Sequence, residues 1–382
     1  MRLIPELRFG AAEGELVPSV SRSRLPSLTG LRFVAAFVVF LTHLDISWML
    51  MPVAMAAVSF FFVLSGFVLT WSARESEPYQ AFWRHRFWKI FPNHAVTWVT
   101  MMGLLAATGI SAEPGRVPPG PTPAGPALAN LFLVHTWLPA PTLMFSVNPV
   151  SWTLAAEAAF YLLFPLILPL VMRVRPERLL VAAGIAVAAI WLVPTLSFVL
   201  HGPAVLPGEF DLPLVRLWFA DYLPLSRLPE FVLGMLLARM VRRGVMPRIG
   251  VVLPGIALLT AVAVAGKFLP IPFWFAAATI GPVALMIVGA ASMDLRGARS
   301  LWATRSPVFL GQLSFAFYLI HYQVITLFEH VFGDWPRGTL GTLGVGVLLC
   351  GVSVFLAWLL YRFVEQPLMQ RFSHRSPAGP RA

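Results

Sequence analysis

The chain is 382 residues long, and 58% of its residues are hydrophobic whereas only 12% are charged. A soluble domain of this size carries about 25% charged residues, so this composition, with a mean hydropathy of +0.77, excludes a soluble protein. The net charge of +11 is compatible with nucleic-acid binding, but basic cytoplasmic loops of membrane proteins produce the same excess. The distribution of the charge favours the membrane interpretation, and we expect no nucleic-acid partner.

The sequence offers few groups for metal or thiol chemistry. Its single cysteine, Cys350, lies inside an apolar stretch, so neither an intrachain disulfide nor a thiolate metal cluster is expected. No His-Glu-x-x-His spacing and no Gly-rich phosphate loop occur, which argues against zinc hydrolysis and nucleotide phosphoryl transfer. The first 26 residues are polar and show no apolar core of a cleavable signal peptide.

Apolar stretches of membrane-spanning length follow one another along most of the chain. They predict an all-α, polytopic membrane bundle of about ten transmembrane helices, at residues 28–48, 52–72, 92–110, 152–172, 178–199, 226–242, 249–266, 271–291, 308–330 and 339–364. The two longer connections, 111–151 and 200–225, are rich in Pro and Gly and are expected to be irregular surface loops. We therefore expect a polar cytoplasmic segment (1–26), a membrane domain (27–366) and a basic cytoplasmic tail (367–382).

Lys and Arg residues are divided unequally between the two sides of the predicted bundle. Of the 28, we count 22 on the side of the N-terminus and five on the other side, with Arg32 inside the first helix. Because cytoplasmic loops carry the positive excess, both termini should be cytoplasmic in a multi-pass protein of the inner (plasma) membrane. Arg32 then lies near the inner boundary, and His43 lies beyond the midplane toward the outer leaflet.

The first apolar stretch contains a cation, Arg32, and an imidazole, His43. Eleven residues correspond to three helical turns plus about 20°, so both side chains share one face, roughly 16 Å apart along the axis. Ionisable groups inside a membrane helix are costly unless they face protein or water. A snorkelling arginine and a packed histidine are the structural alternatives, but the shared face favours a functional cavity.

The second apolar stretch contains Ser65 followed by a glycine within an aromatic run. This pattern favours close helix packing over a nucleophilic serine, since no base motif accompanies it, and we expect Ser65 to line the cavity. The following segment, 82–94, interleaves Arg84, Arg86 and Lys89 with aromatic residues. Such a segment either anchors the chain at the membrane surface or holds a phosphorylated cytosolic ligand, and both can apply.

The fourth apolar stretch contains an acid, Glu157, and Tyr161 follows four residues later on the same helix face. A buried carboxylate must be paired or protonated, and the expected partners are His43 and Arg32. Glu157 is therefore either half of a structural ion pair or a catalytic group that orients the imidazole of His43.

Further aromatic and polar residues are expected to line the same cavity, namely Trp152, Tyr318 and His321. The second histidine could equally well be a packing residue. Two pairs at i, i+3 spacing are expected to be local salt bridges, namely Arg227 with Glu230 and Arg362 with Glu365.

Six of these motifs, taken in chain order, resemble the acyltransferase 3 family of integral-membrane O-acyltransferases. They are Arg32 with His43 eleven residues later, Phe-Phe-Val-Leu-Ser-Gly-Phe (61–67), Lys-Ile-x-Pro (89–92), Ser-Trp-Thr-Leu-x-x-Glu-x-x-Phe-Tyr (151–161), Tyr-Leu-x-His (318–321) and Phe-Val-Glu-x-Pro (363–367). The resemblance covers all ten predicted helices.

The resemblance implies transfer of an acyl group from acyl-CoA, such as acetyl-CoA, to a hydroxyl of a sugar, polysaccharide or macrolide-type product. Such O-acetylation occurs in carbohydrate modification and antibiotic biosynthesis. Carried over by position, it makes His43 the general base and Arg32 a contact of the donor or of the intermediate. Our own interpretation of the residues adds Glu157 as the catalytic group that orients His43, and Arg84, Arg86 and Lys89 as contacts of the donor phosphates. Acyl-CoA would be a co-substrate, with no permanently bound cofactor and no metal; the other partners are the acceptor and membrane lipid. Direct transfer and an acyl group held on His43 both remain open.

The sequence also departs from the family pattern. Ala158 stands where a second Glu is usual, Lys89 where Arg is common, and Tyr322-Gln323 where Trp-Pro is usual. The short length and the Arg- and Ala-rich usage resemble actinobacterial members that acylate macrolides. The alternative function is a transporter or flippase of a polar or lipid-linked solute, which would use a similar charged cavity.

Overall fold

The structure is a computed structural model, and it describes residues 24–44, 51–74, 78–113, 117–206, 210–246, 249–333 and 339–373. Within these ranges the chain forms ten helices of 16 residues or more: α1 (Pro26–Thr42), α2 (Met51–Ser72), α3 (Tyr79–Thr108), α6 (Trp152–Arg173), α7 (Leu179–Ser197), α9 (Pro224–Arg242), α10 (Val252–Phe268), α11 (Ile280–Leu295), α12 (Arg305–Phe332) and α13 (Thr339–Leu359). Of the described helices, five are long and apolar enough to cross a membrane: α2, α6, α7, α12 and α13. The prediction of an all-α membrane protein is therefore confirmed.

Shorter elements connect these helices. They are α4 (Ala124–Leu131), α5 (Pro141–Met144), η2 (Pro149–Ser151), η3 (Pro176–Arg178), β1 (Ala204–Leu206), β2 (Phe210–Pro213), α8 (Leu214–Leu217), η4 (Trp218–Tyr222), η5 (Ile271–Trp274), η6 (Leu301–Ala303), η7 (Leu360–Glu365), α14 (Gln366–Leu368) and η8 (Met369–Ser373). The two strands pair antiparallel. Most of the predicted polar segment and basic tail lies outside the described residues.

The first helix is shorter than its apolar stretch predicts. It begins at Pro26, whose fixed φ suits a first helical turn, and ends at Thr42 instead of residue 48. Residues 45–50 lie outside the described ranges. Ser27 does not cap its own helix, because its backbone N–H and its hydroxyl donate to the carboxylate of Asp294 at 2.9 and 2.6 Å. The start of α1 is thus tied to the end of α11.

The third helix is longer than its apolar stretch predicts. It begins at Tyr79, not at residue 92, so the basic segment 82–94 forms its first half. Apolar composition alone missed this half because charged and aromatic residues alternate there. As a consequence, Arg86 and Lys89 project from a helix inside the bundle, and the segment is more than a surface anchor.

Glycines allow the two central helices α2 and α9 to pack closely. A Cβ at Gly66 of α2 would lie 1.9 Å from the carbonyl oxygen of Phe231, and a Cβ at Gly234 of α9 would lie 1.9 Å from that of Val63. Neither helix could therefore carry a larger residue at its crossing point. The predicted packing role of the small residue after Ser65 is confirmed, and the crossing helps place α2 at the centre of the bundle.

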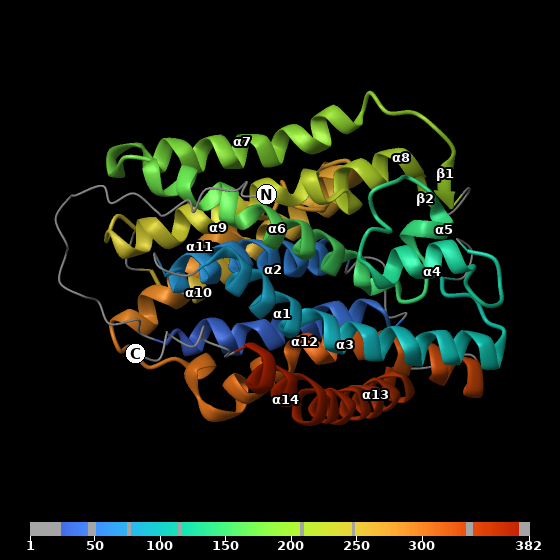
Figure 1. Cartoon of the computed structure of the whole chain (residues 1–382). Helices are drawn as coiled ribbons and strands as arrows, with labels where there is room; N and C mark the ends of the chain where they lie inside the picture. Colours follow the sequence, from blue (N-terminus) through green and yellow to red (C-terminus); the bar gives the residue numbers. More distant parts are fainter. Residues whose placement is uncertain are drawn as a thin grey trace, which may run out of the picture.

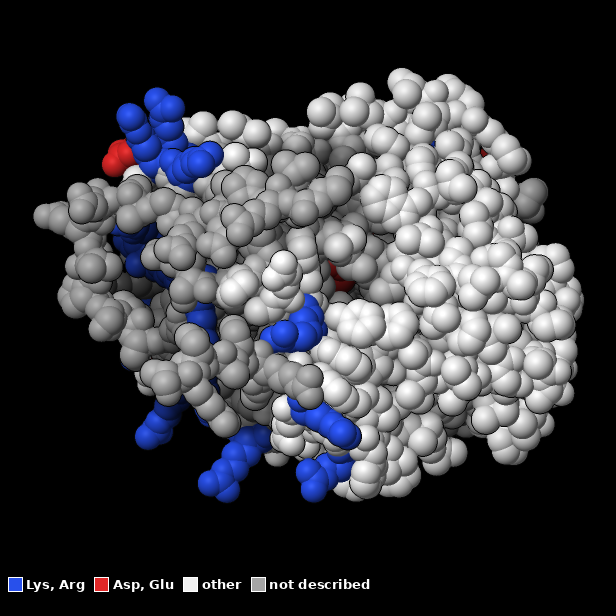
Figure 2. All heavy atoms as spheres, viewed as in Figure 1, with Lys and Arg blue, Asp and Glu red and all other residues white. Residues whose placement is uncertain are grey.

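Helices α7 and α13 lie on opposite sides of the bundle, with α1, α2 and α12 between them (Figure 1). Many large apolar residues of α7 and α13 are exposed, among them Ile185 and Val347, as expected for faces that contact lipid. On the face drawn in Figure 2, Lys and Arg side chains gather toward the end where α6 meets α7, and the opposite end is nearly free of them.

The long connections are more ordered than predicted. The connection 111–151 contains α4, α5 and η2, and the connection 200–225 contains the β1–β2 hairpin, α8 and η4. Several of their polar residues are completely buried, including Asn130, His135 and Ser151. The Asn130 amide donates to the carbonyl of Ser146 and to the hydroxyl of Ser151, so these segments form a hydrogen-bonded cap.

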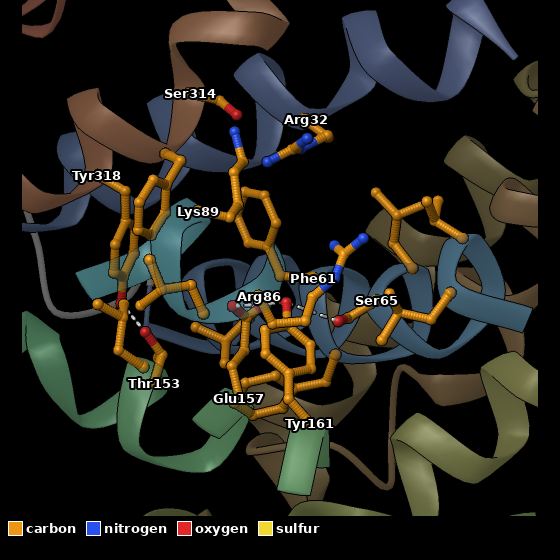
Figure 3. Close-up of a pocket in the computed structure, with 18 residues that line it drawn as sticks. Arg32, Phe61, Ser65, Arg86, Lys89, Thr153, Glu157, Tyr161, Ser314 and Tyr318 are labelled. Carbon is orange, nitrogen blue, oxygen red and sulfur yellow. Dashed lines mark hydrogen bonds between the residues drawn. The ribbon is translucent and has the colours of Figure 1, made fainter. Parts of the chain in front are cut away.

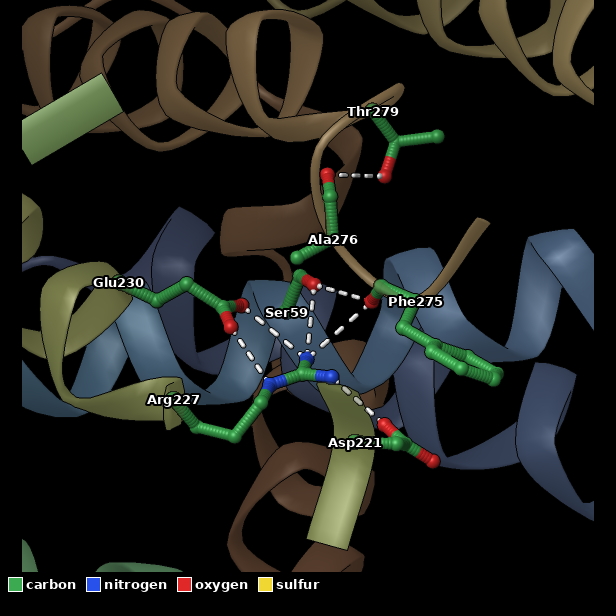
Figure 4. Close-up of polar contacts among 7 residues, drawn as sticks. All are labelled: Ser59, Asp221, Arg227, Glu230, Phe275, Ala276 and Thr279. Carbon is green, nitrogen blue, oxygen red and sulfur yellow. Dashed lines mark hydrogen bonds and ion pairs between the residues drawn. The ribbon is translucent and has the colours of Figure 1, made fainter. Parts of the chain in front are cut away.

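A buried arginine connects four segments near this cap (Figure 4). Arg227 pairs with Glu230 and Asp221, each at 2.6 Å, and its guanidinium also donates to Ser59 and to the carbonyl of Phe275. The predicted local Arg227–Glu230 salt bridge is confirmed, but it belongs to a buried network that joins α2, η4, α9 and the chain after η5.

Candidate active site

A cavity lies among α1, α2, α3, α6 and α12 (Figure 3). Its wall is mostly apolar and includes Phe61 of α2. Polar groups from five helices point into it: Arg32, Ser65, Arg86, Lys89, Thr153, Glu157, Tyr161, Ser314 and Tyr318. A largely apolar pocket with a few convergent polar groups is the usual form of a small-molecule site.

Three cations enter this cavity, Arg32 from α1 and Arg86 and Lys89 from α3. The guanidinium of Arg86 lies 5.9 Å from the ring centre of Tyr161, a cation–π contact that orients it. With Glu157 as the acid of the same cavity, these groups give its lining an excess of positive charge. The cavity therefore favours an anionic ligand.

Lys89 is held from outside the cavity. Its ammonium forms an ion pair with Glu365 of η7, whose second oxygen accepts a hydrogen bond of 2.7 Å from Asn93. Glu365 is buried, whereas Arg362 donates at 3.4 Å to Gln366. The predicted pairing of Glu365 with Arg362 is therefore wrong, because η7 turns the carboxylate toward α3. Sequence analysis missed Glu365 and Asn93, although Glu365 belongs to a motif quoted for the family.

Glu157 is bound by Tyr161, as their spacing predicts. The Tyr161 hydroxyl donates to Glu157 at 3.2 Å, and the Ser65 hydroxyl donates to Tyr161 at 3.3 Å. Figure 3 shows these three side chains together at one side of the cavity, with Arg86 beside them. Ser65 is thus joined to an acid through a tyrosine, which is not the arrangement of a serine nucleophile with an adjacent base.

His43 lies directly after α1 and contacts a second histidine. Its Nδ1 lies 2.9 Å from the carbonyl of Val39 and 3.4 Å from Nε2 of His321. His321 Nδ1 lies 3.3 Å from the carbonyl of Phe317. With the hydrogen of each ring on Nδ1, His43 donates to the Val39 carbonyl and His321 donates to the Phe317 carbonyl, and the more distant His321 Nε2 shares the same hydrogen of His43. His43 Nε2 then has the lone pair that a general base requires.

Tyr318 lies between the cavity and this histidine pair. Its hydroxyl accepts a hydrogen bond of 3.1 Å from Thr153, and its ring centre is 5.8 Å from that of His321. Tyr322 packs edge-on against His43, with ring centres 5.3 Å apart. Thr153 and Tyr322 are further residues of this region that sequence analysis did not assign.

The structure separates residues that we expected to share one cavity. Arg32 and Glu157 both line it, but His43 is not among its described lining residues, because α1 ends there and His43 turns toward α12. The expectation that Glu157 directly orients His43 is therefore not met. His321 occupies that place, and it too lies outside the described lining, as do Arg84 and Trp152. Trp152 instead stacks on Tyr222, with ring centres 4.8 Å apart.

The fold and the site together define a class: a helical membrane protein with an interior, positively charged cavity and a histidine pair beside it. The acyltransferase 3 family, whose description is "Acyltransferase domain", matches residues 25–362. The chain belongs to this family and is a membrane acyltransferase.

Curated relatives agree with this assignment. The chain is 38% identical to "Acyltransferase MdmB" of Streptomyces mycarofaciens, over 93% of this chain and 94% of that protein. It is 30% identical to "Exopolysaccharide production protein ExoZ" of Rhizobium meliloti, over 83% and 90%. It is 24% identical to "Peptidoglycan O-acetyltransferase OatA" of Listeria monocytogenes, over 91% of this chain but 56% of that protein. No solved structure matches the chain significantly.

Proposed function

We propose that the protein transfers an acyl group from acyl-CoA to a hydroxyl of a sugar, polysaccharide or macrolide-type product in the plasma membrane. The observation that carries this proposal is the convergence of Arg32, Arg86 and Lys89 on one apolar cavity in a chain of the acyltransferase family. Acyl-CoA combines anionic phosphates with a long uncharged arm and a thioester, which suits a cationic rim above a mostly apolar wall. Acylation of a hydroxyl agrees with the name of the relative called an O-acetyltransferase.

The acyl-CoA donor would be bound by electrostatic attraction. Arg86 suits a diphosphate because its planar guanidinium can form two parallel hydrogen bonds, and Lys89 and Arg32 add point charges nearby. Arg84 precedes this group on the same helix and would act at the surface, where it attracts the donor. The thioester would then extend along the apolar wall toward Tyr318.

Activation of the acceptor hydroxyl would depend on His43. Its Nε2 takes the proton of the acceptor hydroxyl as the oxygen attacks the thioester carbonyl, and the C–S bond breaks as the ester C–O bond forms. The imidazolium then returns the proton to the leaving thiolate, so the products are an ester and free CoA. His321 would keep His43 in the reactive tautomer. In the covalent alternative, Nε2 attacks the thioester first and the acyl group passes to the acceptor in a second step.

Glu157 would serve the donor cavity, with Tyr161 fixing its carboxylate. It faces Arg32 and Arg86 and would keep their guanidinium groups in place while the donor is absent. When the donor binds, its phosphates would replace Glu157 as the partner of these groups. This role differs from the direct pairing with His43 expected from sequence. The asymmetric distribution of Lys and Arg supports a topology with both termini in the cytosol, where acyl-CoA is present.

Purified protein in nanodiscs tests the proposal. With radiolabelled acetyl-CoA and a panel of sugar and macrolide acceptors, we expect a labelled ester and release of CoA. The His43→Ala variant should retain its folded state in the membrane and lose transfer. Full activity of that variant would reject His43 as base and as nucleophile. Uptake of a solute without turnover of the thioester would instead favour a transporter.

A further inference from the structure

A second, smaller cavity adjoins the first one. It lies between the end of α2, the beginning of α3 and the middle of α6. The two cavities share Leu69 and Arg86 as lining residues, so the guanidinium of Arg86 stands at their junction. Neither the family assignment nor the sequence motifs assign a role to this second cavity.

The lining of the second cavity combines positive charge with aromatic surface. Arg74 and Arg86 supply two guanidinium groups, and Tyr79 and Phe82 supply aromatic rings. Phe82 is itself fixed by stacking on Phe164 of α6, with ring centres 5.0 Å apart. Helix α3 begins at Tyr79, so the partially positive end of a 30-residue helix lies at the same cavity.

These features match the chemistry of a phosphorylated nucleoside. Guanidinium groups bind phosphate through paired hydrogen bonds, aromatic rings stack on a purine base, and a helix amino terminus favours an anion. The first cavity differs, because most of its wall is apolar and its polar groups include an acid, Glu157. The two cavities therefore suit the two ends of one molecule that has a nucleotide at one end and a long uncharged arm at the other.

We infer that the second cavity binds the nucleotide end of the acyl-CoA donor. Arg74 then contacts the 3′-phosphate of the ribose, and Arg86 contacts the diphosphate. This inference rests on the proposed function and adds to it the residues that select a nucleotide-bearing thioester. The pantetheine arm then passes Arg86 into the first cavity, where Lys89 and Arg32 face it. Arg86 contacts both parts of the donor, whereas Arg74 contacts only the nucleotide.

The phosphate of an anionic lipid headgroup has part of the same chemistry, so the experiment must separate the two ligands. Arg74→Gln removes the charge at an exposed position where folding should not depend on it. Arg178→Gln is the matched control, since Arg178 is also exposed and lies at the predicted cytoplasmic side but lines neither cavity. Binding is measured in nanodiscs of zwitterionic lipid and again with phosphatidylglycerol added.

Three probes report on the two ends of the donor: acetyl-CoA, adenosine 3′,5′-bisphosphate and S-acetylpantetheine. In the wild type, adenosine 3′,5′-bisphosphate should displace acetyl-CoA. Arg74→Gln should weaken both nucleotide probes by roughly tenfold, the loss of one charge-assisted contact, and leave S-acetylpantetheine unchanged. Arg178→Gln should change none of the three.

The other outcomes reject either the nucleotide site alone or the proposed function as well. Unchanged acetyl-CoA affinity in Arg74→Gln, or an equal loss for S-acetylpantetheine, overturns the nucleotide site while the proposed donor stands. An effect of Arg74→Gln that is confined to retention of phosphatidylglycerol assigns the cavity to lipid and overturns it as well. A wild type that binds no acetyl-CoA overturns the proposed function together with this inference.

Discussion

His43 and His321 face each other across the contact between α1 and α12, with 3.4 Å between Nδ1 of the first and Nε2 of the second. The hydrogen bonds of both rings to their own helices place the hydrogen of each ring on Nδ1, and under this assignment Nε2 of His43 carries the lone pair. The catalytic base of this chain would thus be oriented by the imidazole of His321, where the sequence predicted Glu157.

Loss of His43 should lower the transfer rate more than loss of His321 does. His43→Ala should lower the transfer rate at least 100-fold, since general base catalysis contributes about 10²–10⁴. His321→Ala should lower kcat about tenfold and shift its pH profile, because the imidazole of His43 keeps its bond to the Val39 carbonyl but loses the neighbouring ring that orients it. Steady-state kinetics over a range of pH check both variants. An unchanged KM for the donor is expected in each; a His321 variant with a raised donor KM and normal kcat would contradict the positioning role.

Removal of the charge of Glu157 should change donor binding and turnover in different ways. Glu157→Gln keeps the size of the side chain but leaves Arg32, Arg86 and Lys89 without an acid in their cavity. The donor KM should therefore fall or stay constant, while kcat decreases because the guanidinium groups lose their fixed orientation.

Tyr161→Phe removes the hydrogen bond to Glu157 and is the matched partner for a double-mutant cycle. Since the two residues share that contact, their effects should not add. Strictly additive losses in the double variant would show that the tyrosine acts independently of the acid.

Much of the fold could be predicted from apolar periodicity, and the exceptions have physical causes. The ten long helices of the described residues lie near the ten apolar stretches, because burial in lipid demands that composition. The first half of α3 was missed since its cations face a protein cavity, and hydropathy does not distinguish such a face from a surface loop. The cap formed by 111–151 was missed because its order comes from buried side-chain hydrogen bonds, such as those of Asn130.

In the candidate site, contacts within one helix could be predicted from the sequence, whereas contacts between helices could not. Residues on one helix at i, i+4 spacing could be paired from sequence, as Glu157 and Tyr161 were. Contacts between helices could not, because helical spacing says nothing about which neighbouring helix a face meets. His43 was therefore assigned to Glu157 when its partner is on α12, and Glu365 was assigned to Arg362 when its partner is on α3.

The ion pair between Lys89 and Glu365 should support both stability and donor binding. Glu365→Gln leaves the ammonium without its acid and should cost about 1–3 kcal/mol of unfolding free energy, with a raised donor KM. The double variant Lys89→Met with Glu365→Leu removes both charges, so stability should recover although donor affinity stays low. Thermal unfolding and donor binding of the same preparations separate the two effects. Recovery of donor affinity in the double variant would exclude Lys89 as a donor contact.

Arg227 should be a stability residue with no direct part in transfer. Arg227→Met leaves the buried acids Asp221 and Glu230 without a cation and should cost about 3–5 kcal/mol. Lys267→Met, an exposed cation on the same predicted side, is the control and should change stability by less than about 0.5 kcal/mol. Unfolding temperatures at a fixed scan rate in one detergent give the comparison. A similar small effect of both substitutions would mean that the buried network is energetically neutral.

The capping region should make stability depend on pH through His135, which is completely buried and contacts Ser151. Burial, with a smaller contribution from neighbouring His94, lowers the pKa of His135 to about 3. The unfolded chain, with its ordinary histidine pKa of about 6.5, therefore binds the proton more readily, and stability falls as the pH drops from about 6.5 toward 3. At pH 5 this loss is about 2 kcal/mol. His135→Gln cannot titrate, so its unfolding temperature should decline less than that of the wild type between pH 7 and pH 5. Parallel curves for the two proteins would show that His135 takes up its proton without opening the cap.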